Sequence, residues 1–129
     1  MSHAFNRPSA TVFTWTPTQQ DFDAFARLSG DDNPIHVDPV FSARTRFGRT
    51  VSHGMLLYTR VHACLEQLYP GRQHDLQTLM FPNPSYADEE LSLSFAEDPD
   101  QPDLVLVEIS RTADRAVTLS GTCRLGGRS

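Results

Sequence analysis

The hydrophobic positions of the chain change their period once, near residue 70. Before that point they recur at helical spacing, over 17–29 and again over 52–69. After it, hydrophobic and polar residues alternate over 91–96 and 117–125, which is typical of half-buried strands. The pattern therefore predicts helices in the first half of the chain and a sheet in the second.

Prolines and glycines mark the borders of these elements. Thr16-Pro17 and Asp38-Pro39 each place a capping side chain before a proline that suits the first helical position. Gly30 suits the left-handed residue that ends a helix. We therefore expect helices over 17–29, 39–45 and 52–69, and strands over 11–15, 76–81, 91–96, 104–110 and 117–125.

The order of these elements predicts the fold class. The helix expected over 52–69 is hydrophobic on most faces of its first half, which is typical of a buried helix. A buried helix followed by several antiparallel strands indicates an α+β fold. No repeat or linker divides the chain, so we expect a single domain over 1–129. Residues 1–9 lack the hydrophobic stretch of a signal peptide and are expected to form a flexible arm.

Composition narrows the classes of partner. The formal net charge is -5 and every basic residue is an arginine, so binding to nucleic acid is not expected. No run of about 18 apolar residues predicts a membrane helix. Cys64 and Cys123 have apolar neighbours and are expected to be buried free thiols, which favours a cytoplasmic location. They form no metal-ligand spacing with the histidines, and no metal site is expected.

Candidate chemistry is concentrated just after Gly30. Asp31 and His36 are five positions apart, a spacing that would separate them on a helix. Asn33-Pro34 disfavours a helix between them, so we expect a loop over 31–37 that turns both side chains toward one point. A carboxylate beside an imidazole suits general acid–base work on water. The alternative is an ordinary turn with an exposed histidine.

The stretch that contains this pair resembles the hydratase signature of the MaoC-like family. SGDDNPIH, over 29–36, follows the family pattern, with Ser42 or Ala43 as its next small residue, and HGM, over 53–55, matches its second part. The type it resembles is the stand-alone (R)-specific enoyl-CoA hydratase. The resemblance implies a hotdog fold, in which an antiparallel sheet wraps around a long central helix, and it implies a homodimer.

The same resemblance implies a reaction. Water would add to a trans-2-enoyl-CoA to give the (R)-3-hydroxyacyl-CoA, or the reverse, with coenzyme A present only as part of the substrate and no other cofactor. Asp31 and His36 would be the acid–base pair. The backbone N–H of Gly54, at the positive end of the long helix, would hold the oxyanion. Residues expected to support this site are Ser29, Asn33 and His53.

A further set of side chains is expected to contact the substrate. They are Leu57, Val61, His62 and Leu65 on the central helix and Arg44, Arg46 and Arg49 before it. The arginines could bind the anionic coenzyme A, although a solvated turn explains them equally well. His62 stands where the family usually has a small residue. It would narrow the acyl pocket or change the hydrogen bonds of Asp31, unless it faces a dimer partner or solvent.

Other functions stay open beside this one. A dehydratase acting on acyl carrier protein thioesters would use the same acid–base pair. A thioesterase would need a carboxylate on or near the central helix, which offers only Glu66 near its far end, so the loop favours hydration. A non-catalytic protein that binds acyl thioesters would keep the fold without needing Asp31 and His36. Ligand binding without turnover would identify this last class.

Overall fold

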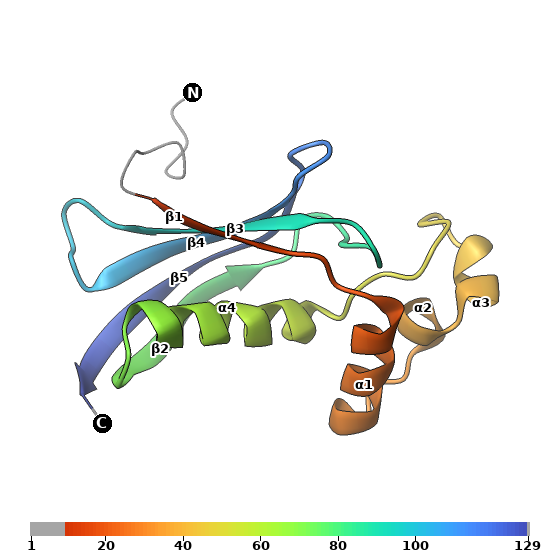
Figure 1. Ribbon diagram of the computed structural model, residues 1–129, viewed down its shortest axis with the longest axis horizontal. Helices are drawn as coiled ribbons and strands as arrows, with labels where there is room; N and C mark the ends of the chain where they lie inside the picture. Colours follow the sequence, from red (N-terminus) through yellow and green to blue (C-terminus); the bar gives the residue numbers. More distant parts are fainter. Residues whose placement is uncertain (1–9, 129) are drawn as a thin grey trace.

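Five strands and four helices make up the part of the chain described by the computed structural model, residues 10–128 without the side chains of 76, 77 and 128. In order they are β1 (Thr11–Trp15), α1 (Gln19–Ser29), α2 (Pro34–Val37), α3 (Pro39–Ala43), α4 (Gly54–Leu68), β2 (Arg72–Met80), β3 (Leu91–Glu97), β4 (Leu104–Arg111) and β5 (Val117–Arg128). α4 lies along one face of the sheet, and α1 to α3 gather beyond the end where α4 begins (Figure 1). The flexible arm expected at 1–9 lies outside the described residues.

The five strands form one sheet in the order β1-β3-β4-β5-β2, with every neighbouring pair antiparallel. Alternate residues of β3 and β4 are buried, and the register sets Leu93 opposite Ile109 and Phe95 opposite Val107. This alternation gives the sheet one apolar face. The α+β class and the antiparallel sheet are confirmed. β2 and β5 are longer than predicted, since each contains polar positions that the alternation did not include.

The core lies between that face and α4. Leu57, Val61, Cys64 and Leu65 are spaced as one helical stripe and pack against the sheet. Cys64 and Cys123 are buried free thiols, as predicted. The expectation that α4 is buried on most faces is wrong within the described chain, because the sheet covers only one side. No helix in residues 10–128 combines the length and apolarity that crossing a membrane requires.

α1 begins later than predicted, because a different threonine caps it. Thr18 accepts a hydrogen bond from the N–H of Asp21, and the Asp21 carboxylate accepts one from the N–H of Thr18. This reciprocal capping box starts the helix after Thr18 and leaves Thr16 outside it. At the other end Gly30 has a left-handed φ of 80° and donates its N–H to Ala26, as expected.

The loop expected over 31–37 contains the short helix α2. The restriction on the residue before a proline applies to Asn33, which lies outside the helix as its cap. The Asn33 side chain accepts a hydrogen bond from the N–H of Ile35 at 3.1 Å, and Pro34 occupies the first helical turn. α2 therefore carries His36 on a fixed backbone rather than on a loop.

Candidate active site

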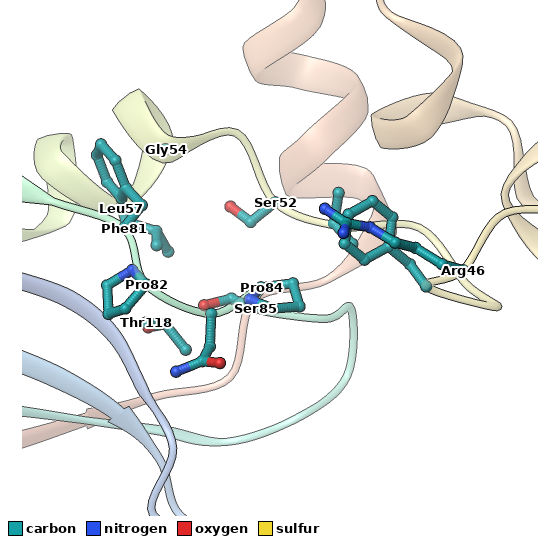
Figure 2. Close-up of a pocket in the computed structure, with 12 residues that line it drawn as sticks. Arg46, Ser52, Gly54, Leu57, Phe81, Pro82, Pro84, Ser85 and Thr118 are labelled. Carbon is teal, nitrogen blue, oxygen red and sulfur yellow. The ribbon is translucent and has the colours of Figure 1, made fainter.

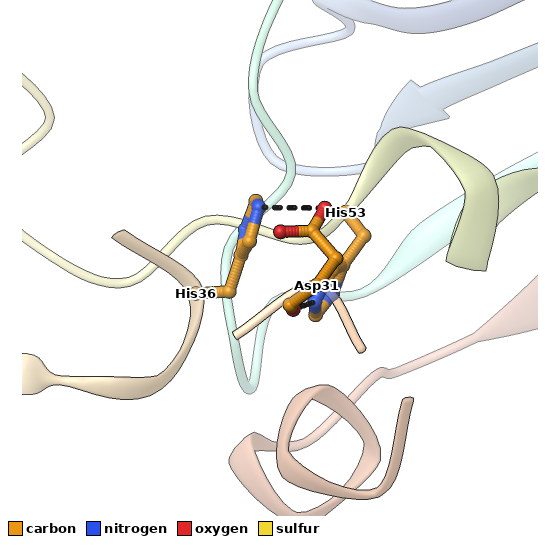
Figure 3. Close-up of side chains that lie close together, drawn as sticks. All are labelled: Asp31, His36 and His53. Carbon is orange, nitrogen blue, oxygen red and sulfur yellow. Dashed lines mark hydrogen bonds and ion pairs between the residues drawn. The ribbon is translucent and has the colours of Figure 1, made fainter. Parts of the chain in front are cut away.

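Asp31 and His36 come together beside the start of α4. Asp31 follows α1 and His36 lies near the end of α2, with 3.8 Å between Oδ2 of Asp31 and Nε2 of His36 (Figure 3). The His36 side chain is 10% exposed and that of Asp31 is 55% exposed. The alternative of a turn with an exposed histidine is therefore wrong. The pair joins a buried imidazole to a carboxylate that solvent can reach.

The backbone around Val51 holds the His36 ring in one tautomer. Nδ1 of His36 lies 2.8 Å from the carbonyl oxygen of Val51, and the Val51 N–H donates to the carbonyl of Ile35 at 2.9 Å. A carbonyl oxygen can only accept, so Nδ1 carries the proton in the neutral ring. Nε2, on the side of Asp31, is then the unprotonated nitrogen. His36 is thus oriented to accept a proton there.

Asp31 is anchored through its backbone. Its N–H donates to the hydroxyl of Ser29 at 3.1 Å, and that hydroxyl donates to the carbonyl of Phe25 at 2.7 Å. The carbonyl of Asp31 lies 2.8 Å from Nε2 of His53, which donates to it. The backbone N–H and carbonyl of Asp31 are therefore both held, while its carboxylate projects toward His36.

His53 packs against the His36 ring of the pair. Its ring stacks on that of His36, with centroids 3.9 Å apart and an interplanar angle of 23°. The His53 side chain makes no capping hydrogen bond to α4 and instead bonds to the backbone of Asp31. Burial lowers the pKa of His53 below 6.5, although its hydrogen bond to the Asp31 backbone opposes the shift. Burial therefore disfavours a positive charge on His53 against the face of His36.

These three residues could in principle hold a metal ion, because one ligand atom from each lies within 4.8 Å of the others. The ring arrangement argues against it. The lone pairs of an imidazole lie in its plane, and two rings stacked face to face do not direct them at one point. Nδ1 of His36 and Nε2 of His53 also face backbone carbonyls already. The cluster is better suited to moving protons than to ligating an ion.

The first turn of α4 is open beside a cavity. No side chain caps its N-terminus, so the first backbone N–H groups of the helix are available to a ligand. The cavity has a volume of about 290 Å³, and its lining includes Arg46, Gly54, Leu57 and Phe81 (Figure 2). A Cβ on Gly54 would lie 2.9 Å from the Phe81 ring, so only glycine lets that ring approach the helix start.

The other residues expected at the substrate lie elsewhere. Val61 and Leu65 are 3% and 1% exposed and pack in the core, outside the cavity beside Gly54. His62 lies about 12 Å along α4 from Gly54, at 1.5 Å per residue. It contacts His74 of β2 and not Asp31. Their substrate roles stay predictions, which no contact among the described residues supports.

The three arginines do not act as one cluster. Arg44 and Arg46 are both exposed, and of the two only Arg46 lines the cavity. Arg49 pairs with Glu89 at 2.7 Å, and its guanidinium lies over the ring of Tyr86 at 4.6 Å. Arg49 thus ties the turn before α4 to the segment before β3, which leaves Arg46 as the arginine placed to meet an anionic ligand.

Sequence reasoning missed two contributors to the site. Val51 contributes its backbone carbonyl, which a pattern of side chains cannot predict. Phe81 follows the last residue of β2 and precedes a proline, and its 43% exposure is unusual for a large aromatic residue. Ser85, also in the cavity wall, has a buried hydroxyl without a hydrogen-bond partner among the described residues. An aromatic residue at the end of a strand was the one signal available.

A second, larger groove runs between α1 and α4. Its volume is about 590 Å³, and its lining is mainly apolar, including Trp15, Phe25, Leu28 and Leu56. Ser29, whose hydroxyl holds the Asp31 backbone, also lines it. Space for an apolar chain is therefore present on the α1 side of the pair as well as beside Gly54.

Comparison with known proteins places this arrangement in a family. A model described as the MaoC like domain matches residues 2–102. The chain belongs to the MaoC-like family. It is 42% identical to the (R)-specific enoyl-CoA hydratase of Aeromonas caviae over 71 residues, 54% of this chain and 53% of that one. It is 31% identical to the mitochondrial 3-hydroxyacyl-[acyl-carrier-protein] dehydratase of Arabidopsis thaliana over 74 residues, 57% of this chain and 45% of that one.

Solved structures confirm the hotdog fold. An (R)-hydratase from A. caviae involved in PHA biosynthesis superposes with a TM-score of 0.78 at 28% identity, covering 92% of this chain and 93% of that one. The R-hydratase PhaJ1 from Pseudomonas aeruginosa gives a TM-score of 0.81 at 23% identity, over 94% and 81%. The chain spans about half the length of the curated relatives it matches.

Proposed function

We propose that this chain adds water to trans-2-enoyl-CoA thioesters to form (R)-3-hydroxyacyl-CoA, or catalyses the reverse dehydration. The observation that carries the proposal is the pair of acceptors, Oδ2 of Asp31 and Nε2 of His36, 3.8 Å apart beside the open start of α4. Two acceptors at this separation can each take a hydrogen bond from one water molecule. They would hold and activate the nucleophile together.

The reaction needs three events, and the site offers a group for each. The water oxygen bonds to C3 of the enoyl group while one O–H bond breaks and its proton passes to the pair. The π electrons move toward the thioester oxygen, where the Gly54 N–H stabilises the charge, an effect of about 3 kcal/mol for comparable donors. C2 then gains a proton from the pair. Asp31 and His36 therefore exchange roles between hydration and dehydration.

The cavity beside Gly54 fits the thioester end of such a substrate. Leu57 and Phe81 supply apolar surface there, and Arg46 supplies a positive charge at the same cavity. A coenzyme A thioester joins an acyl chain to an anionic group, so it would meet both kinds of surface. The proposed chemistry is acid–base transfer alone and calls for no cofactor beyond the coenzyme A of the substrate. The cytoplasmic location stays a prediction.

A second candidate is dehydration of 3-hydroxyacyl groups on acyl carrier protein. The relative from A. thaliana, named for that activity, supports it. The higher identity to the enoyl-CoA hydratase of A. caviae favours coenzyme A as the carrier. Comparing kcat/KM for one acyl group on both carriers separates the two. We expect the coenzyme A thioester to be the better substrate.

The proposal is tested on the purified chain with crotonyl-CoA, by following loss of the conjugated enoyl absorbance. Asp31→Asn and His36→Gln should each lower kcat by about 10³-fold, because each removes one half of the acid–base pair. Asp32→Asn is the matched control, since Asp32 is an exposed neighbouring carboxylate outside the pair. Chiral analysis of the product should give the (R)-isomer. Binding of enoyl-CoA without turnover would instead identify a non-catalytic acyl-binding protein.

We also propose that the chain acts as a homodimer. β2 is an edge of the sheet, and its last residue, Met80, is 64% exposed. An edge strand with exposed apolar residues tends to pair with another chain. Sedimentation should give twice the chain mass. Met80→Lys should weaken association, whereas Val12→Lys on the opposite edge, β1, serves as the control.

A further inference from the structure

A second group of histidines and a carboxylate lies on the far half of α4, away from the proposed active site. His62 and Glu66 are one turn apart on the exposed side of the helix, and His74 faces them from the edge strand β2. Nδ1 of His62 and Nδ1 of His74 are 3.2 Å apart. One ligand atom from each of the three residues lies within 4.8 Å of the other two.

The His74 side chain is the unusual member of this group. It is only 2% exposed, and its Nε2 is buried without a hydrogen-bond partner in the described chain. This nitrogen faces Oε2 of Glu66 at 3.8 Å, too far for a hydrogen bond. A buried polar atom left without a partner is unfavourable, so the position favours a ligand that His74 can bind.

Glu66 is oriented for the same purpose. Its Oε1 accepts a hydrogen bond from the N–H of Gly71 at 3.1 Å, which leaves Oε2 directed at His74. A carboxylate held through one oxygen keeps the other in place, as is common for groups that bind metal ions.

We propose that His62, Glu66 and His74 bind a divalent transition metal ion of the zinc class. Two imidazoles and one carboxylate form a three-ligand set that leaves a fourth position open, and nitrogen donors favour zinc-class ions over magnesium or calcium. Ligands about 2.1 Å from a tetrahedral ion lie about 3.4 Å from one another. The measured separations, 3.2 Å from Nδ1 of His74 to His62 and 3.8 Å from Nε2 of His74 to Glu66, end on different nitrogens of one ring. One ligand atom from each residue lies within 4.8 Å of the others, so binding through a single His74 nitrogen requires the side chains to close by about 1 Å.

The position of this site gives it a structural role. His62 and Glu66 belong to α4 and His74 to β2, so the ion would link the helix to the edge of the sheet. An ion that binds the folded chain more tightly than the unfolded chain raises the melting temperature. The metal site is separate from the proposed active site, so the proposal does not depend on the proposed enzymatic activity.

The test is titration of the full chain with Zn²⁺ by calorimetry, with a chelator of known affinity as competitor. We expect one ion per chain. Glu66→Gln and His62→Gln should each weaken binding at least 10-fold, since even residues that only support a ligand change affinity by about 10 to 100-fold. Both changes are on exposed side chains, so the variants should fold. His36→Gln and His3→Gln are the controls, because they remove histidines outside the group.

A second readout identifies the ligands. Saturating Zn²⁺ should raise the melting temperature of the wild type and of both controls, and should leave those of Glu66→Gln and His62→Gln unchanged. Failure to bind Zn²⁺ would overturn the proposal and leave His62 and His74 as a plain hydrogen-bonded pair. Binding that survives Glu66→Gln and His62→Gln, or that disappears in His36→Gln or His3→Gln, would place the ion elsewhere and overturn it too.

Discussion

Two groups built from the same parts lie along α4, and they are arranged for different chemistry. Each contains two histidines and one carboxylate. At the start of the helix, the rings of His36 and His53 stack at 3.9 Å with an interplanar angle of 23°. In the second group, the rings of His62 and His74 are 4.9 Å apart at 64°, and their nitrogens face each other. Composition alone does not distinguish a proton-transfer site from a metal site, whereas ring orientation does.

The backbone accounts for the difference. His36 and His53 each give one ring N–H to a carbonyl, of Val51 and of Asp31 respectively, which fixes both tautomers and holds the rings face to face. His62 and His74 instead meet through their Nδ1 atoms with the ring planes inclined at 64°, and the carboxylate beside them is held by a backbone N–H. In the first group, the bonds to carbonyls leave the basic Nε2 of His36 directed at Asp31. In the second group, the ring nitrogens of His62 and His74 face each other, and an ion could bind between the side chains.

The strongest test of this contrast changes one carboxylate in each group to its amide. Asp31→Asn should lower kcat on crotonyl-CoA by about 10³-fold, because it removes half of the acid–base pair. Glu66→Gln should keep kcat within about two-fold, since Glu66 lies far from the reacting atoms in the fold. Zinc affinity should respond in the opposite sense, with a loss in Glu66→Gln and none in Asp31→Asn. Steady-state kinetics and calorimetry on the same preparations give both results.

The contrast fails if the two effects do not separate. A loss of zinc binding in Asp31→Asn would mean that the ion binds at the first group, despite its stacked rings. A loss of activity in Glu66→Gln with an unchanged melting temperature would bring the second group into the reaction. Asp32→Asn, which changes an exposed carboxylate beside the first group, should leave both measurements unchanged.

A smaller effect is expected at Gly54, where the helix start meets the cavity. Gly54→Ala places a Cβ 2.9 Å from the Phe81 ring, which must turn away. We expect a 10 to 100-fold loss of kcat/KM, because the cavity wall moves beside the oxyanion donor. Stability should change by less than about 1 kcal/mol, since alanine favours a helix and the ring is partly exposed. Kinetics with thermal melting separate the two effects.

Phe81→Ala supplies the control for this change. In the Phe81→Ala variant there is no ring for the new Cβ to displace. Adding Gly54→Ala to that variant should therefore cause only a small further loss of activity. An equal loss in both backgrounds would mean that the methyl group itself blocks the substrate. An unchanged kcat/KM in the single variant would contradict the role proposed for this end of α4.

The fold was predictable where hydrophobic period and strong stop signals coincide. The helix predicted over 52–69 agrees with α4 to within two residues at its start and one at its end, because Pro70-Gly71 ends an apolar helical stripe. Where the predicted bounds were wrong, as at the start of α1, local hydrogen bonds set the observed ones. Thr16 and Thr18 both precede an apolar stripe, and only the carboxylate of Asp21 selects Thr18 as the cap.

The candidate site was predictable in part, for a similar reason. Asp31 and His36 lie within one motif, so their proximity could be expected from sequence. The carbonyl of Val51 that selects the His36 tautomer carries no side-chain signal. The second group joins residues from two elements, and His74 lies before the strand predicted over 76–81 although the structure includes it in β2. The spacing of His62 and Glu66, one helical turn apart, was the only sequence signal, and it places just two of the three residues together.

Acidification should weaken the fold through both groups, by a few degrees of melting temperature. Burial lowers the folded-state pKa of His53 and of His74 below 6.5. The unfolded chain therefore binds protons near pH 6.5 that the folded chain does not, and stability present above that pH is lost as the pH falls. Melting curves from about pH 7.5 to about pH 5.5 should show the fall.

His53→Gln tests the origin of this pH dependence, because its amide can still donate to the Asp31 carbonyl but does not titrate. The variant should lose less melting temperature than the wild type over the same range. A wild-type melting temperature that stays constant or rises on acidification would contradict the direction of both pKa shifts. Zinc, if bound, should steepen the fall, since protons compete for His62 and His74.

The smallest effect concerns Cys64, which lies two residues after His62 on α4. Its thiol faces the core, 6% exposed, and burial raises its pKa, so it should not become a thiolate ligand near neutral pH. The Co²⁺-loaded chain should lack the intense ultraviolet band of a cobalt–thiolate bond, and Cys64→Ala should keep the affinity within about two-fold. A thiolate band that disappears in Cys64→Ala would show that α4 rotates on binding. A ligand of the ion would then come from the core side of the helix. The contrast between the two groups, which assumes that α4 stays in place, would no longer hold.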